Sequence, residues 1–113
     1  MRSLRYEELA PISRDGLAAA LADGTPEEAS EALLRLALHD EDFAFIEQTC
    51  TGVLDQREGA PRRAAVLALG HMARIHHTVS DDTVVRLRGL PDDPHLTGVV
   101  ADALDDIASY VNP

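Results

Sequence analysis

The sequence has no lysine, no tryptophan and a single cysteine among its 113 residues, and aromatic residues make up 4% of it. One cysteine, Cys50, excludes an internal disulfide, and its place within a helical pattern predicts a buried, inert thiol rather than a reactive one. No run of 18 uncharged apolar residues occurs, and the first ten residues lack the apolar core of a secretory signal. We therefore expect a cytoplasmic protein that does not enter a membrane.

Positive charge is also scarce. Twenty acidic residues face ten arginines, so the formal net charge is −10. The choice of arginine for every base is typical of a GC-rich, and hence bacterial, genome. A surface this negative repels phosphate backbones and anionic lipids, and it speeds the encounter with basic partners. The charge therefore argues against nucleic acid as a partner and favours a basic protein, unless the acidity serves only to keep the chain soluble.

What the sequence does contain is Ala and Leu at helical spacing, with start and stop signals. Ser13 precedes a predicted helix over 14–23, and Gly24 is expected to end it in the left-handed conformation. Thr25-Pro26-Glu27-Glu28 predicts a capping box that opens a second helix, running to about residue 38. Asp40 is expected to cap a third helix over about 41–56, with Phe43 on its apolar face.

Three further helices are predicted in the second half of the chain. After a break at Gly59, Pro61 opens a helix over 62–77 whose middle is almost wholly apolar, which predicts burial over most of its circumference. Ser80 starts the next helix, with Val84, Val85 and Leu87 as its apolar residues. Asp93-Pro94 starts the last one. No segment alternates in the manner of a half-buried strand.

The second helix of each successive pair repeats at an offset of about 35 residues. A proline lies near the start of each copy, and four apolar columns run through the three copies. Chance matching in a chain rich in Ala and Leu is the alternative, but such a period with one helical hairpin per unit is typical of α-solenoids. The columns are Ala29–Ala64–Val99, Leu33–Ala68–Ala103, Leu34–Leu69–Leu104 and Ala37–Met72–Ile107.

Residues 58–70, EGAPRRAAVLALG, resemble the inner-helix signature of HEAT repeats, and residues 91–104 resemble the next copy. The signature arginine at Arg62 is Thr97 in the third copy and Glu27 in the first, which departs from the family pattern. The resemblance implies an all-α fold, with three HEAT-like helical hairpins stacked as a short right-handed α-solenoid. It also implies that Gly70 permits close approach of the next helix. We expect a single domain over 1–113, with repeats at about 13–39, 40–78 and 80–111.

Neither metal chemistry nor catalysis is predicted. His71, His76 and His77 are spaced by five and six residues, whereas a two-histidine site on one helix uses three or four. Asp106 is in register with His71 at the repeat offset, which suits a structural His–carboxylate contact better than a metal site. The candidate nucleophiles lie in no catalytic motif, and glycine-rich phosphate loops are absent. We expect no cofactor, no metal and no enzymatic activity; the nucleophiles considered are Cys50, Thr51, Ser80 and Ser109.

The remaining constellation is acidic. Asp102, Asp105 and Asp106 lie at i, i+3 and i+4 on the last predicted helix, opposite its apolar face. They lie late in the helix, where a negative charge gains nothing from the helix dipole, so local stability does not explain them. A solvated polar face is the alternative. We predict that these three aspartates, with Arg35 and Arg74, form a partner-binding face.

The most concrete function is that of an immunity protein, which binds and neutralises a basic bacterial toxin such as a nuclease. The chain also bears a looser resemblance, carried by no motif, to small immunity proteins of contact-dependent toxin systems. One alternative is an adaptor or scaffold for an enzyme complex. Another is a lyase or ligand-handling role, in the manner of HEAT proteins that handle tetrapyrroles, which the histidines favour and the shortage of aromatics opposes. We expect a monomer or a weak dimer.

Overall fold

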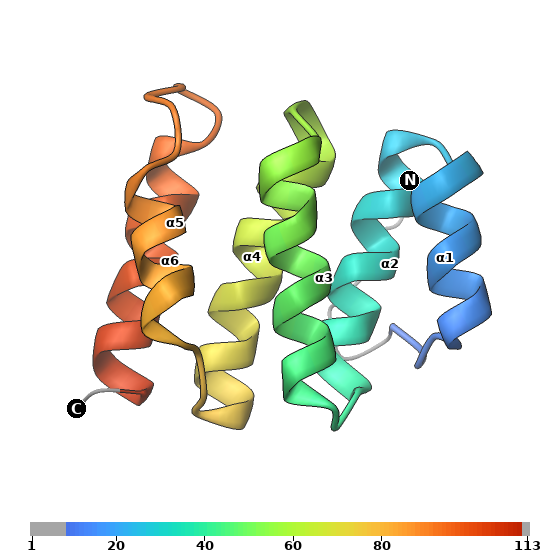
Figure 1. The fold of residues 1–113 in the computed structure, drawn as a ribbon, viewed down its shortest axis with the longest axis horizontal. Coiled ribbons are helices and arrows are strands. Elements are labelled where there is room, and N and C mark those ends of the chain that lie inside the picture. The colour runs from blue at the N-terminus through green and yellow to red at the C-terminus, as the bar shows by residue number, and fades with distance from the viewer. Residues whose placement is uncertain (1–8, 112–113) are drawn as a thin grey trace.

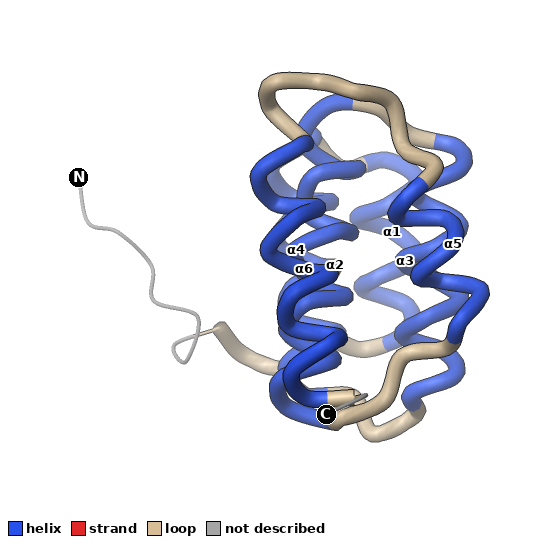
Figure 2. Tube along the Cα trace, turned by 90° about the vertical axis from the view of Figure 1, so that its left-hand side faces the viewer, coloured by secondary structure: helices blue, strands red, loops and turns tan. Residues whose placement is uncertain are grey.

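The computed structural model describes residues 9–111, which form six α-helices and no strand. Successive helices run up and down the molecule (Figure 1). The even-numbered helices lie side by side in one layer and the odd-numbered helices in a second layer (Figure 2). Within residues 9–111 no helix has the length and apolar character needed to cross a membrane. The helices are α1 (Arg14–Asp23), α2 (Pro26–His39), α3 (Phe43–Gln56), α4 (Gly59–His76), α5 (Asp81–Arg88) and α6 (Thr97–Tyr110).

Three of the predicted helix starts are confirmed by their cap hydrogen bonds. The Ser13 hydroxyl accepts a hydrogen bond from the Gly16 N–H at 2.9 Å, and Ser80 caps α5 in the same manner. At α2, Thr25 Oγ1 accepts from the Glu28 N–H at 3.1 Å, and Glu28 Oε1 accepts from the Thr25 N–H at 3.0 Å. These hydrogen bonds from Thr25 lower the pKa of Glu28 below its ordinary 4.5. Local sequence alone therefore determines where α1, α2 and α5 begin.

The other starts differ from the prediction. Asp42, not Asp40, caps α3: its Oδ1 accepts from the Phe45 N–H at 3.1 Å, while Asp40 Oδ1 accepts from the Asp42 N–H at 2.8 Å. The chain thus forms a tight turn before α3, which begins two residues later than expected. In the same way Asp93 Oδ1 accepts from the His95 N–H at 2.8 Å, and the resulting turn delays α6 to Thr97. In contrast, α4 begins early, at Gly59.

The left-handed stop predicted at Gly24 is wrong. Gly24 has φ −77° and ψ 165°, an extended conformation that any residue adopts. Glycine is needed there for space instead, because a Cβ would lie 2.6 Å from the carbonyl oxygen of Ala20. The helix that does end in the left-handed region is α4, and the residue there is His77, with φ 58°.

The centre of the molecule is α4, which packs against α2, α6 and α3 and has ten buried residues. Its predicted burial over most of its circumference is confirmed. Two of the apolar columns, Leu33–Ala68–Ala103 and Ala37–Met72–Ile107, are buried throughout, at equivalent places on α2, α4 and α6. Phe43 and Val85 are exceptions to the predicted apolar faces, since they are 37% and 67% exposed.

Candidate functional site

The predicted acidic site falls partly on the seam between α4 and α6. Arg74 and His71 of α4 and Asp102 and Asp106 of α6 line a small depression of about 140 Å³. An Arg74 guanidinium nitrogen lies 3.7 Å from Asp106 Oδ2. Asp105 is exposed and lies outside this lining. The structure therefore brings Asp102, Asp106 and Arg74 together and leaves Asp105 beside them on the surface of α6.

His71 forms the buried wall of this depression. It is 6% exposed, and its Nδ1 contacts the Arg74 guanidinium. Burial, and then the positive charge of Arg74, lower the pKa of His71 to about 4. His71 is therefore neutral at pH 7, and Arg74 joins it to Asp106 in one polar cluster. No group of three or more potential metal-ligating side chains gathers anywhere in residues 9–111.

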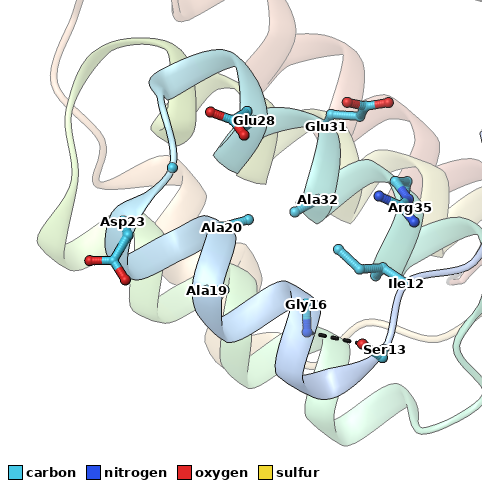
Figure 3. A pocket seen from close by; sticks show the side chains of 11 residues that line it. Ile12, Ser13, Gly16, Ala19, Ala20, Asp23, Glu28, Glu31, Ala32 and Arg35 are labelled. Atoms are coloured by element: carbon cyan, nitrogen blue, oxygen red, sulfur yellow. Dashed lines mark hydrogen bonds between the residues drawn. The ribbon is translucent and has the colours of Figure 1, made fainter.

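Arg35, the remaining predicted residue, lies elsewhere. Its Nε donates to the Ala10 carbonyl and its Nη2 to the Pro11 carbonyl, both at 2.8 Å. These bonds hold the segment before α1 against α2. Arg35 also lines a groove of about 490 Å³ between α1 and α2. Figure 3 shows Arg35 at one end of this groove, and small side chains such as Ala32 line its middle. Three carboxylates also line the groove: Asp23, Glu28 and Glu31.

Most of the arginines form contacts within the protein itself. Of the eight in residues 9–111, six contact carboxylates or backbone carbonyls of the same chain. Arg57, for example, donates to the Leu21 carbonyl, and Arg62 Nε donates to the Leu54 carbonyl at 3.1 Å. Positive charge is thus tied into the scaffold, while exposed carboxylates such as Asp102 and Asp105 face outward. The surface field is that of an anion.

Three of the candidate nucleophiles are buried in the core or hydrogen-bonded to the backbone. Cys50 is fully buried, and burial, reinforced by the negative charge of Glu47, raises its pKa to about 12. Thr51 Oγ1 donates to the Glu47 carbonyl at 2.9 Å, and Ser80 is the cap of α5. A thiol held neutral and two hydroxyls used by the backbone are not activated for attack.

The sequence did not indicate one apolar surface, which lies at the edge of the molecule opposite the α1–α2 turn. Phe43 begins α3, Ile75 lies in the last turn of α4, and Tyr110 ends α6; their exposed fractions are 37%, 46% and 45%. These helix ends lie at the same level along the lower edge of Figure 1. The available signal was the rarity of aromatics, since the chain has two Phe and two Tyr in all.

The histidines at this end connect those residues. The His76 ring lies 4.6 Å from the Phe43 ring, centroid to centroid, and its Nε2 is 2.9 Å from the Ala37 carbonyl oxygen. The His77 ring lies 6.0 Å from the Tyr110 ring, and its Nδ1 is 3.1 Å from the Tyr110 carbonyl oxygen. The two ring pairs therefore connect the start of α3 and the end of α6 to the C-terminal end of α4.

No protein-family model matches this chain, and no curated protein matches it either. Among solved structures, it is similar to a chain in the crystal structure of a CDI complex from Cupriavidus taiwanensis LMG 19424. The two chains are 29% identical, with a TM-score of 0.80, and the similarity covers 96% of this chain and 98% of that one. The match therefore extends over the whole helical fold rather than over one hairpin of it.

Proposed function

We propose that this protein is an immunity protein of a contact-dependent toxin system, which binds a basic toxin domain and blocks its activity. The observation that carries the proposal is the near-complete similarity to a chain of a CDI complex. Contact-dependent systems of this kind pair a toxin with an immunity protein. A match over nearly all of both chains supports a role for this protein as one component of such a pair, with a protein as its partner.

The chemistry of the chain favours the immunity side of the pair. A toxin needs reactive or substrate-binding groups, whereas here Cys50 is buried with a raised pKa and Ser80 serves as a helix cap. An inhibitor of a basic enzyme needs an acidic surface, and this chain carries a net charge of −10 while most of its described arginines bind its own groups. Opposite charge on the two partners speeds their association. A cytoplasmic location follows, because that is where the toxin would act.

The repeat pattern supports an interpretation of the fold as a short HEAT-like α-solenoid. Equivalent columns on α2, α4 and α6 are buried, and Gly70 lies where α6 comes close: a Cβ there would be 3.3 Å from Asp106 Oδ2 and 3.6 Å from Ala103 Cα. On this interpretation the chain is one domain with three repeats, at about 13–39, 40–78 and 80–111. Residues 1–8 and 112–113 lie outside the described part.

Within this proposal, Asp102 and Asp105 are the outward carboxylates that meet the toxin. Asp106 takes part in this contact as a pair with Arg74, because the two side chains form an ion pair. Arg35 holds the segment before α1 and supports the fold rather than the contact. The ligand-handling alternative loses its main support here, since His76 and His77 lie against backbone carbonyls.

We expect the neighbouring gene to encode a toxin-like domain, and the test is co-expression of this chain with that domain. We expect the chain to restore growth of the producing cells and to co-purify with that domain. Continued toxicity, together with no complex on size-exclusion chromatography, would contradict the proposal.

The acidic surface has its own matched comparison. Asp102→Asn with Asp105→Asn should slow association with the toxin domain, and the loss should shrink at high salt. Asp23→Asn with Glu31→Gln makes the same change of charge at the α1–α2 groove. If the second pair slows association and the first does not, the contact surface is the groove, and the proposed role of the α6 aspartates is wrong.

A further inference from the structure

We propose that an apolar patch made of Phe43, Ile75 and Tyr110, here named the end patch, anchors the toxin partner. The end patch lies at the edge of the molecule where α3 begins and where α4 and α6 end. This inference rests on the proposed function and identifies the surface that carries its affinity. The end patch differs from the acidic site predicted on α6, although the two adjoin.

The end patch is the place where large apolar groups gather on the surface. In residues 9–111, four large apolar side chains are exposed: its three members and Val85, which lies apart from them in the middle of α5. The Phe43 ring lies against the His76 ring, and the Tyr110 ring lies against the His77 ring, so both aromatic members of the end patch pack on the C-terminal end of α4, in whose last turn Ile75 lies. Several large apolar side chains exposed at one edge of a molecule mark an interaction surface, whereas a single one such as Val85 does not.

The backbone at this end favours the same conclusion. His77 ends α4 with φ 58°, in the left-handed region where glycine is the residue that avoids strain. Gly59 occupies this region at φ 67°, so the chain does use glycine where the backbone alone matters. Retaining an imidazole at position 77 keeps a ring against Tyr110 at a conformational cost. Such strained residues concentrate at functional surfaces.

The surroundings of the end patch identify its occupant as a basic protein. Asp81 and Asp82 begin α5 at this end, and Glu41 lies in the turn just before Phe43; all three are exposed. A second copy of this chain would bring the same charge of −10 against this rim, so a basic partner with an apolar recess is the better complement.

The end patch also continues the α6 surface. Asp102, Asp106 and Tyr110 recur at i, i+4 and i+8, so they lie along one side of α6. On this arrangement the aspartates form a charged rim that governs the rate of association. The aromatic and aliphatic groups at the end form the desolvated centre that governs dissociation.

The experiment measures binding of the purified toxin domain from the neighbouring gene by biolayer interferometry. Ile75→Ala and Tyr110→Ala each remove an exposed side chain from the end patch, and Val85→Ala is the matched control on α5. We expect each patch variant to raise Kd by at least about 30-fold, chiefly through faster dissociation. The control should stay within about twofold of the unmodified chain, and all three variants should remain folded by circular dichroism, because none of the removed side chains belongs to the buried core.

The outcomes separate the two proposals. If the unmodified chain does not bind the domain, the proposed function fails. If the unmodified chain binds and both patch variants bind as tightly as Val85→Ala, the end patch is not the anchor, while the proposed function stands. If sedimentation shows a dimer of the unmodified chain that Tyr110→Ala dissociates, and toxin binding is unchanged, the patch belongs to a second copy and the inference is wrong.

Discussion

Replacement by leucine should stabilise the protein at the mid-helix glycine Gly52 and destabilise it at the mid-helix glycine Gly70. In Gly52→Leu the new side chain meets open space, because a Cβ at Gly52 has no atom within 4 Å. Leucine is also a better helix former, so we expect a gain of about 0.5–1 kcal/mol. At Gly70 a Cβ would already lie 3.3 Å from Asp106 Oδ2 and 3.6 Å from the backbone of Ala103. The remaining carbons of leucine would have to displace the Asp106 carboxylate, which pairs with Arg74, from the small depression between α4 and α6.

The magnitude at Gly70 follows from two opposing effects. The gain in helix propensity is at most about 1 kcal/mol, while forcing extra carbons between closely packed helices costs about 3 kcal/mol. The net loss of about 2 kcal/mol corresponds to a decrease in Tm of about 8 °C for a chain of this size. Thermal unfolding followed by circular dichroism at 222 nm measures both variants. A neutral or stabilising Gly70→Leu would refute the close packing of α4 on α6, and a destabilising Gly52→Leu would refute the open space at α3.

Two further predictions concern buried titratable groups. Because the pKa of His71 is about 4 when folded against 6.5 ordinarily, the unfolded chain gains a proton first as pH falls. The free energy of unfolding should therefore decrease by up to about 3 kcal/mol as the pH falls from 6.5 to 4. Urea titrations at several pH values should show that His71→Gln lacks this contribution to the pH dependence. Cys50, buried and with a pKa raised to about 12, should not react with Ellman's reagent at pH 8 until the protein is unfolded. Rapid labelling of the native protein would contradict this placement.

Short-range features of the sequence determined much of the helical framework. The hydroxyl caps at Ser13, Thr25 and Ser80 form as predicted, because a cap needs only a hydroxyl and an N–H about three residues later. The burial of α4 also followed from sequence, since a helix that is apolar all round must be covered on most sides.

Tertiary structure decided features that depend on competition or on distance. Asp40 and Asp42 are both capable caps, and the turn between α2 and α3 selected Asp42. Gly24 carries a helix-stop signal, yet its role is to make room for the Ala20 carbonyl, which depends on the path of the chain after α1. No local pattern expresses either choice.

The grouping of residues into surfaces that a partner could contact depended on the tertiary structure more than any other feature did. Phe43, Ile75 and Tyr110 are more than thirty residues apart in sequence from one to the next, and they share one edge of the molecule only because α3 begins at the level where α4 and α6 end. Arg35 was predicted to belong to the same partner-binding face as the α6 aspartates, and only the structure shows that its guanidinium donates to the carbonyls of Ala10 and Pro11. Helical periodicity shows which side of its own helix a residue occupies. It does not show which helix ends meet or which charges the fold uses internally, because those depend on packing between segments distant in sequence.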